Sequence, residues 1–133
     1  MTAEDLDTKW QEYVDSVLIR SGLIRNAAIY GTRPPMKWAS TDGATINPSE
    51  VIDMGKAFVD PTVVTNNGIV FADIKYTVIQ IDHDRLVGRV KNGGCVICPG
   101  KNCLVIASYL DPYETFAISL TSELATFLRN NGY

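Results

Sequence analysis

Hydrophobic and β-branched residues are densest between residues 75 and 109, and their pattern predicts an antiparallel sheet. Short runs of them are separated by turn signals rich in Asp, Asn, Gly and Pro, as in a meander of strands joined by tight turns. In residues 75–81 and 104–107 the apolar side chains fall on both odd and even positions. A strand with one solvated face would alternate, so this pattern predicts a sheet covered on both faces. The runs are residues 75–81, 85–90, 95–98 and 104–109, with turns at 82–84, 92–94 and 99–102.

Both ends of the chain carry helical periodicity, and we expect them to supply part of that cover. Thr2 and Asp5 resemble a capping box, and Gly22 can end the first helix in a left-handed conformation. Asp111-Pro112 opens the last helix, and Gly132 lies just past its end. The apolar stripes are Leu6, Trp10, Tyr13, Val14, Val17 and Leu18 in the first helix, and Phe116, Ala117, Leu120, Leu124, Phe127 and Leu128 in the last.

The middle of the first half predicts a hairpin followed by a second helix. Residues 27–30 and 36–39 read as its strands, around a turn that contains two prolines. Asn47 is the expected N-cap of the helix, with Pro48 at the first helical position and Val51, Met54 and Phe58 on one face. A short strand is expected at residues 69–71, and residues 63–67 are ambiguous. Strands group in the middle and helices lie at the ends, so the fold class is α+β.

Composition is that of an ordinary globular protein. The chain has 133 residues, 46% hydrophobic and 20% charged, which suits one domain over residues 1–133. Since the acidic start lacks the features of a signal peptide and no apolar run is long enough to span a membrane, we expect a cytosolic protein. We also expect a monomer. The net charge of −3 argues against a dedicated nucleic-acid binder. Basic residues crowd the sheet region, where they suit an acidic partner, a phosphorylated lipid headgroup or a plain solvated face: Arg85, Arg89, Lys91 and Lys101.

The residues capable of catalytic or metal chemistry do not form a recognisable site in the sequence. Cys95 and Cys98 point to opposite faces if they lie on a strand, so core cysteines are a better interpretation than a metal site completed by Cys103 and His83. His83 lies between two aspartates in a predicted turn, without a nucleophile motif nearby. We therefore expect a protein that is not an enzyme and uses no cofactor or metal.

Aromatic residues suggest a binding surface. Aromatic positions on a helical stripe usually belong to a core, and that interpretation stays open here. If the terminal helices pack together, however, the rings can form one exposed groove, and flat rings with polar tips suit Pro-rich peptides in a polyproline II conformation. The residues concerned are Trp10, Tyr13, Trp38, Phe127 and Tyr133.

An ordered set of short motifs resembles the profilin family. No single motif is specific, but their order and spacing extend from Lys9 to Tyr133, with residues 1–8 as an N-terminal extension. The motifs are Trp10-Gln11-Glu12-Tyr13-Val14-Asp15, Ala27-Ala28-Ile29 followed by Trp38-Ala39, Asn47-Pro48-Ser49-Glu50, Gly55-Lys56-Ala57-Phe58, Lys75-Tyr76-Thr77-Val78-Ile79, Asn92-Gly93-Gly94 and Leu104-Val105-Ile106 with Tyr109.

The resemblance implies a central antiparallel sheet with helices on both faces, the terminal helices packed together, and two binding surfaces. The aromatic positions named above match the family's polyproline site, with Phe127 where the family usually has Tyr or His. A second surface binds monomeric actin in the family, and basic residues there also meet phosphoinositides, which suits Arg89 and Lys91. The matching or neighbouring actin positions are Phe58, Lys75, Val78, Arg89 and Lys91.

The resemblance therefore predicts a regulator of actin filament assembly that also captures proline-rich assembly factors. Two departures bear on actin. Val90 interrupts the family's basic run, and residues 113–116 replace the Pro-Gly-x-Cys segment that often opens its last helix. They favour an alternative: an interaction module that keeps the proline groove and has weak or lost actin binding.

Overall fold

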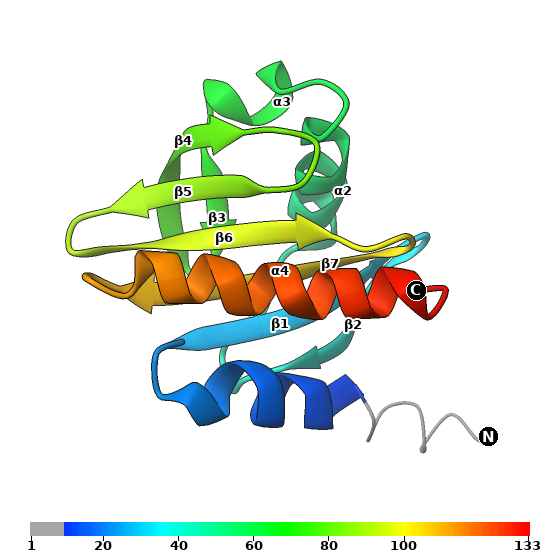
Figure 1. Ribbon diagram of the computed structural model, residues 1–133. Helices are drawn as coiled ribbons and strands as arrows, with labels where there is room; N and C mark the ends of the chain where they lie inside the picture. Colours follow the sequence, from blue (N-terminus) through cyan, green and yellow to red (C-terminus); the bar gives the residue numbers. More distant parts are fainter. Residues whose placement is uncertain (1–9) are drawn as a thin grey trace.

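The computed structural model describes residues 10–133, without the side chains of Val17 and Leu18. Its centre is a seven-stranded sheet in the order β2-β1-β7-β6-β5-β4-β3, and every neighbouring pair is antiparallel (Figure 1). The predicted hairpin, short strand and meander are all present. The strands are β1 (Asn26–Thr32), β2 (Pro35–Ser40), β3 (Ile69–Phe71), β4 (Ile74–Ile81), β5 (Leu86–Val90), β6 (Gly93–Pro99) and β7 (Cys103–Leu110).

The helices lie where the periodicity places them, with one irregular element. Residues 10–13 are α-helical and continue as a π-helix, η1 (Val14–Leu18), and a 3₁₀-helix, η2 (Ile19–Ser21), so the predicted first helix ends where expected but has an irregular backbone. Gly22 follows with φ +76°, as expected for a helix end. The predicted capping box at Thr2 and Asp5, the stripe residue Leu6 and the extension over residues 1–8 lie outside the described residues. The other helices are α2 (Pro48–Ala57), α3 (Thr62–Thr65) and α4 (Glu114–Asn130).

Local side-chain and backbone chemistry explains where the helices begin and end. The Asn47 side chain accepts a hydrogen bond from the Ser49 backbone N–H, which caps α2 as the sequence predicts. The ambiguous stretch at residues 63–67 forms the end of α3 and a turn that ends at Gly68, whose φ is +70°. Within residues 10–133, no helix combines the length and the apolar character needed to cross a membrane.

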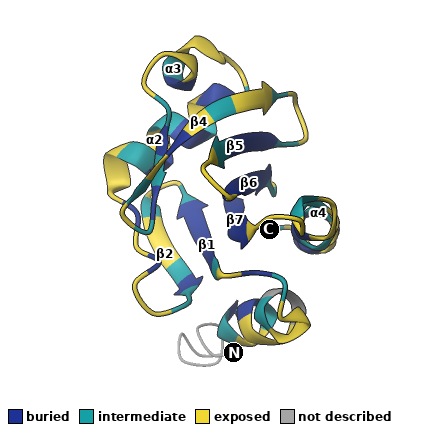
Figure 2. Ribbon diagram, turned by 90° about the vertical axis from the view of Figure 1, so that its left-hand side faces the viewer, coloured by how far each residue is buried: buried dark blue, intermediate teal, exposed yellow. Residues whose placement is uncertain are grey.

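Helices cover both faces of the sheet, as predicted. The N-terminal helical segment and α4 lie on one face, and α2 and α3 lie on the other (Figure 2). Each face has its own apolar core. The core under α4, which we call the α4-side core, includes Val14, Ile29, Val96, Val105 and Leu124. The core under α2, which we call the α2-side core, includes Met54, Phe71, Leu86, Ile97 and Ile106.

The cover is complete over the central strands and incomplete at β4. Every residue of β6 from Gly93 to Cys98 is buried, whereas Lys75, Thr77 and Ile79 on one face of β4 are exposed, Ile79 by 57%. The expectation that both faces of residues 75–81 would be buried was therefore wrong. The physical reason is reach, because α4 packs on β6 and β7 and leaves this face of β4 to solvent.

Candidate functional site

The five aromatic side chains singled out in the sequence form one connected group, which we call the aromatic cluster. Trp10 is at its centre, stacked on Trp38 with ring centroids 4.7 Å apart and an interplanar angle of 20°. Tyr133 meets Trp10 edge-on at 4.7 Å. Tyr13 lies 5.9 Å from Trp10 and 5.5 Å from Phe127. These centroid distances fall in the range of favourable aromatic pairs, so the rings stabilise one another's positions.

The cluster draws on three parts of the fold that are distant in the chain. Trp10 and Tyr13 lie in the N-terminal helical segment, Trp38 on β2 and Phe127 on α4. Gly31 on β1 makes room for Trp38, because a Cβ atom at that position would lie 2.6 Å from the indole Nε1. The Trp38 ring therefore packs directly on the backbone of β1, and the Trp10 ring stacks on Trp38.

Gln11 ties the N-terminal helical segment to the edge of the sheet. Its amide Nε2 donates to the Ser40 carbonyl oxygen at 3.1 Å, and its Oε1 accepts from the Ser40 backbone N–H at 3.4 Å. The side chain thereby pairs with a backbone edge in the way a neighbouring strand would. Since Trp10 precedes Gln11 and Trp38 lies two residues from Ser40, this contact holds the two tryptophans in register.

Tyr133 is held in place by backbone contacts. Its N–H donates to the Leu128 carbonyl at 2.9 Å, and its carbonyl oxygen accepts from the Asn102 N–H at 2.6 Å. Gly132, with φ +89°, makes the reversal after α4. The Tyr133 ring is half-buried against the α4-side core and still reaches Trp10.

Exposure differs across the cluster. Trp10 is 5% exposed and belongs to the α4-side core, whereas Phe127 is 46% exposed and Tyr13, Trp38 and Tyr133 are intermediate. Of the two interpretations that the sequence left open, core or exposed groove, Trp10 fits the core and Phe127 fits the groove. No residue in the described part of the chain hydrogen-bonds the hydroxyls of Tyr13 and Tyr133. The surface thus combines apolar ring faces with free hydroxyl groups, a chemistry that suits an extended apolar chain with carbonyl groups.

The residues predicted for a second surface do not all lie together. Lys75 and Arg89 share one face of the sheet, because Thr77 pairs with Arg89 and Lys75 is two residues from Thr77. Lys91 is exposed in the turn after β5. Val78 and Phe58, by contrast, pack against the α2-side core on the other face.

Arg89 is paired with Asp111 at the end of β7. Both guanidinium nitrogens reach the carboxylate, Nη1 to Oδ1 and Nη2 to Oδ2, each at 2.8 Å. The hydrogen bond from Arg89 lowers the pKa of Asp111, and the same bond raises the pKa of Arg89. The charge of Arg89 is therefore partly neutralised. Its side chain is 30% exposed, and its guanidinium already makes a bidentate contact with Asp111.

Sequence reasoning missed an exposed apolar group beside this ion pair. Phe116, predicted to lie in the core, is 61% exposed, and Leu110 and Tyr113 are 48% and 40% exposed. Leu110 and Tyr113 line one hollow, and Phe116 follows one helical turn after Tyr113. The helical wheel held a signal, because Phe116 and Phe127 are roughly three turns apart and fall together at one edge of the stripe.

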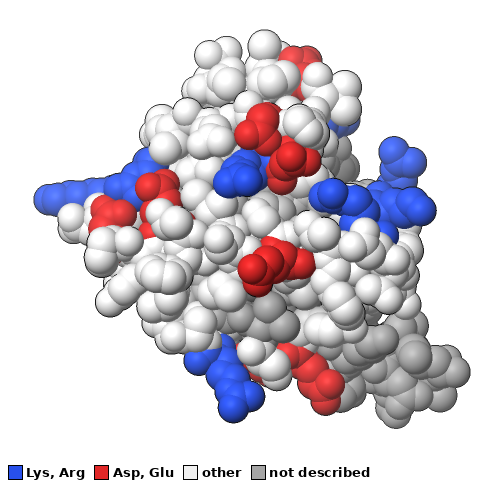
Figure 3. Space-filling view, viewed as in Figure 1, with Lys and Arg blue, Asp and Glu red and all other residues white. Residues whose placement is uncertain are grey.

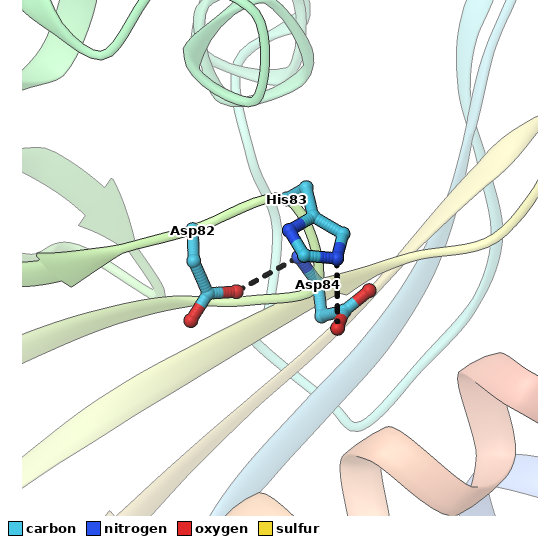
Figure 4. Close-up of side chains that lie close together, drawn as sticks. All are labelled: Asp82, His83 and Asp84. Carbon is cyan, nitrogen blue, oxygen red and sulfur yellow. Dashed lines mark hydrogen bonds and ion pairs between the residues drawn. The ribbon is translucent and has the colours of Figure 1, made fainter.

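His83 lies in a solvated turn between β4 and β5. Figure 4 shows the His83 imidazole beside Asp84, with Nε2 3.3 Å from a carboxylate oxygen. Asp82 Oδ1 accepts the backbone N–H groups of Asp84 at 2.8 Å and Arg85 at 3.0 Å, and these bonds lower its pKa. The His83 side chain is 87% exposed, so this cluster has the features of a capped turn.

The three cysteines lie on both sides of the sheet, as the strand alternation predicts. Cys95 belongs to the α2-side core, and Cys98 and Cys103 belong to the α4-side core. All three are buried free thiols. Burial raises the pKa of Cys103 to about 11 and raises the pKa of the other two, so the thiols stay protonated at neutral pH.

Charges on the face that carries α4 are interspersed. Figure 3 shows basic side chains in several separate groups, with acidic side chains between most of them. A further basic group lies at the right-hand edge of this view, over the turns that join β1 to β2 and β6 to β7. Sequence reasoning had placed the basic residues in one sheet region, whereas the fold distributes them.

The family model for profilin matches residues 8–133. Profilin of Schizosaccharomyces pombe is 31% identical over 127 residues, which cover 93% of this chain and 98% of that protein. Its crystal structure superposes with a TM-score of 0.82, and that of Acanthamoeba castellanii profilin II, 28% identical and covering 93% of this chain and 99% of that one, superposes at 0.84.

Two solved complexes share the fold at lower identity. One is mouse profilin IIa with a double repeat from the FH1 domain of mDia1, at 23% identity and a TM-score of 0.76. It covers 93% of this chain and 99% of the mouse chain. The other is the LokiProfilin1 complex with rabbit actin, at 20% identity and a TM-score of 0.69, covering 92% of this chain and 96% of that one. The family match over nearly the whole chain, with the same sheet and the same packing of terminal helices, shows that this chain belongs to the profilin family.

Proposed function

We propose that the aromatic cluster binds proline-rich peptides. The observation that carries this proposal is the assembly of Trp10, Tyr13, Trp38, Phe127 and Tyr133 into one connected surface with exposed ring faces. The mouse profilin IIa complex with FH1 repeats supports a peptide-binding role for the fold.

The mechanism follows from the shape of the ligand. A polyproline II segment is already extended and has no internal hydrogen bonds, so it loses little conformational entropy on binding. Its rings pack against the exposed parts of the Trp38, Phe127 and Tyr133 rings, and its free carbonyl groups accept hydrogen bonds from the tyrosine hydroxyls. Phe127 contributes a ring face without a hydroxyl, so it adds apolar contact only.

Phe127→Ala tests the site, because this ring is exposed and its removal leaves the core intact. We expect proline-peptide affinity to fall about 5- to 30-fold, since truncation of an interface aromatic typically costs 1–2 kcal/mol. Binding is followed by the fluorescence of the protein's two tryptophans, Trp10 and Trp38. The matched control is Phe116→Ala, another exposed ring on the same helix that lies outside the aromatic cluster. Equal losses in both variants, or none in Phe127→Ala, would reject the assignment.

Trp10→Ala is a less informative variant. Trp10 is 5% exposed and packs in the α4-side core, so its removal changes stability together with any binding. Variants of the exposed members of the cluster separate the effect on peptide binding from the effect on stability.

We also propose that the opposite end of the sheet binds monomeric actin, so that the protein regulates filament assembly. The LokiProfilin1 complex with rabbit actin supports this role for the fold. Lys75, Arg89 and Lys91 supply positive charge, and the exposed Tyr113 and Phe116 supply the apolar surface that an interface core requires. Actin held there leaves the aromatic cluster free, so a proline-rich assembly factor can carry the complex to a filament end.

Arg89→Glu tests the second surface. We expect weaker retention of monomeric actin, and weaker binding to phosphoinositide vesicles if Arg89 and Lys91 also meet lipid headgroups, with proline-peptide affinity unchanged. The measurements are competition with filament assembly and vesicle co-sedimentation. If the wild-type protein binds proline peptide and leaves actin assembly unchanged, the alternative holds: an interaction module without actin binding, consistent with the pairing of Arg89 with Asp111.

A further inference from the structure

A groove of about 390 Å³ lies where α2 faces the turns of the sheet, and of the residues predicted for the two binding surfaces only Phe58 lines it. Its floor is apolar, made by Val51, Gly55 and Leu104. Three cationic side chains line it: Arg33 from the β1–β2 turn, Lys56 from α2 and Lys101 from the β6–β7 turn. We call this the basic groove, and its full lining is Thr32, Arg33, Val51, Ile52, Gly55, Lys56, Phe58, Val59, Pro99, Gly100, Lys101, Cys103 and Leu104.

The charged side chains that line the basic groove are all positive. None of the residues that line it is acidic. Arg33, Lys56 and Lys101 are exposed, and across residues 10–133 none of the three forms an ion pair or a side-chain hydrogen bond. This contrasts with Arg89, whose guanidinium is taken by Asp111. On an acidic protein, three free cations around one hollow favour an anionic ligand.

The basic groove is adjacent to the aromatic cluster through two contacts. Trp38 lies on Gly31, and the next residues, Thr32 and Arg33, line the groove. Tyr133 lies against Gly100, where a Cβ atom would be 3.1 Å from the Tyr133 carbonyl oxygen, and Lys101 follows.

The two turns that carry these residues are joined directly. The Thr32 backbone N–H donates to the Asn102 carbonyl oxygen at 3.0 Å, and Asn102 in turn donates to the Tyr133 carbonyl. The groove and the aromatic cluster therefore share one rigid rim, and a single extended chain that passes Tyr133 arrives at the groove.

We propose that the basic groove binds acidic residues that flank the proline run of a peptide seated on the aromatic cluster. This proposal rests on the peptide-binding function and deepens it, because it assigns a determinant of partner choice. A polyproline II chain advances about 3.1 Å per residue, so carboxylates a few residues beyond the last stacked proline reach the turns of the sheet. Charge complementarity of this kind selects among partners and speeds association.

A peptide suits this site better than a membrane surface. The cations surround a concavity with an apolar floor, which fits a narrow chain, and they lie on the rim that the aromatic cluster shares. A flat bilayer would favour a convex basic surface. Binding of an anionic lipid is therefore kept as a competing outcome of the test.

The first measurement compares three peptides with the same proline run and different flanks: Asp-rich, Ser-rich and Lys-rich. We expect the Asp-rich peptide to bind about 3- to 10-fold more tightly than the Ser-rich peptide and the Lys-rich peptide to bind more weakly, since each exposed charge pair contributes little by itself. The advantage should shrink between ~0.05 M and ~0.5 M salt, because exposed charges are screened. Each flank is tested at the N-terminal end and at the C-terminal end of the proline run.

The second measurement assigns the effect to the groove. In Lys56→Gln/Lys101→Gln the preference for the Asp-rich peptide should disappear, while affinity for the Ser-rich peptide stays the same. Lys75→Gln is the matched control, because Lys75 is also exposed and lies on β4 outside the groove. A preference that survives in the double variant, or is lost equally in the control, overturns the proposal.

Three other outcomes also overturn it, and they can be distinguished from one another. If the Ser-rich peptide binds and the Asp-rich flank adds nothing, the proposal fails and the aromatic site stands; if no peptide binds, both fail. If the flank adds nothing and the double variant loses affinity for vesicles that contain phosphoinositide, the groove is a lipid site.

Discussion

At the scale of single residues, pairing decides which charges are available. Arg89 and Lys101 look alike in the sequence as basic residues of the sheet region. In the fold Arg89 makes a bidentate contact with Asp111, whereas the Lys101 side chain has no hydrogen-bond or ion-pair partner among the described residues. A partner of Arg89 must compete with an internal carboxylate, and a partner of Lys101 does not.

The Arg89–Asp111 pair predicts a pH-dependent contribution to stability. The pKa of Asp111 is lowered by Arg89 from its ordinary 3.8, so the contribution is present above that value and is lost as pH falls through the lower folded-state pKa. We expect Asp111→Asn to unfold at a lower temperature than wild type at neutral pH, and the two melting temperatures to converge once the pH falls below the folded-state pKa of Asp111. Asp42→Asn, an exposed carboxylate outside any ion pair of the described residues, is the control. A difference that persists in acid would point to a cause other than this ion pair.

At the scale of elements, the N-terminal helical segment depends on the sheet edge for its position. Its backbone changes from α-helix to π-helix at Val14 and ends as a 3₁₀-helix at Ser21, and isolated helices of this length are marginal in water. Gln11 and Trp10 supply the contacts that fix it on β2.

Gln11→Ala should lower the free energy of unfolding by about 1–2 kcal/mol, because it removes two hydrogen bonds to the Ser40 backbone. It should also weaken proline-peptide binding, since Trp10 and Trp38 lose a contact that keeps them in register. Chemical denaturation and the fluorescence titration measure the two effects.

Gln80→Ala is the control for Gln11→Ala, because the Gln80 amide bonds only the nearby Asp82 side chain, at 3.3 Å. If Gln11→Ala shows the full predicted loss of stability and its peptide binding is unchanged, Gln11 anchors the N-terminal helical segment without positioning the tryptophans.

At the scale of the whole molecule, one sheet carries two cores and separates the surfaces. Both tryptophans lie on the α4 side, whereas Met54 lies in the α2-side core and is fully buried. Because the strands are shared, neither core is complete without the other.

Met54→Ala should therefore destabilise the whole molecule, by about 2–5 kcal/mol. We expect its unfolding curves from tryptophan fluorescence and far-UV circular dichroism to shift together, although fluorescence reports the α4 side. Leu124→Ala, in the α4-side core, is the comparison. Curves that separate in Met54→Ala would mean that the two sides unfold independently.

The sequence by itself determined the elements and the composition of the aromatic cluster. Alternation and turn residues predicted the meander, Asn47-Pro48 predicted the start of α2, and the spacing of Trp10, Tyr13 and Phe127 placed rings on the terminal helices. These features are local or periodic, so they can be read from a single chain.

The tertiary structure alone decided exposure, pairing and adjacency. It left one face of β4 and the side chain of Phe116 in solvent because α4 extends only over the central strands. It paired Arg89 with Asp111 across twenty-two positions, and it brought Arg33, Lys56 and Lys101 around one groove beside Tyr133. Such contacts join residues distant in the chain, and no periodicity records them, because they depend on how the strands are ordered and where the helices pack.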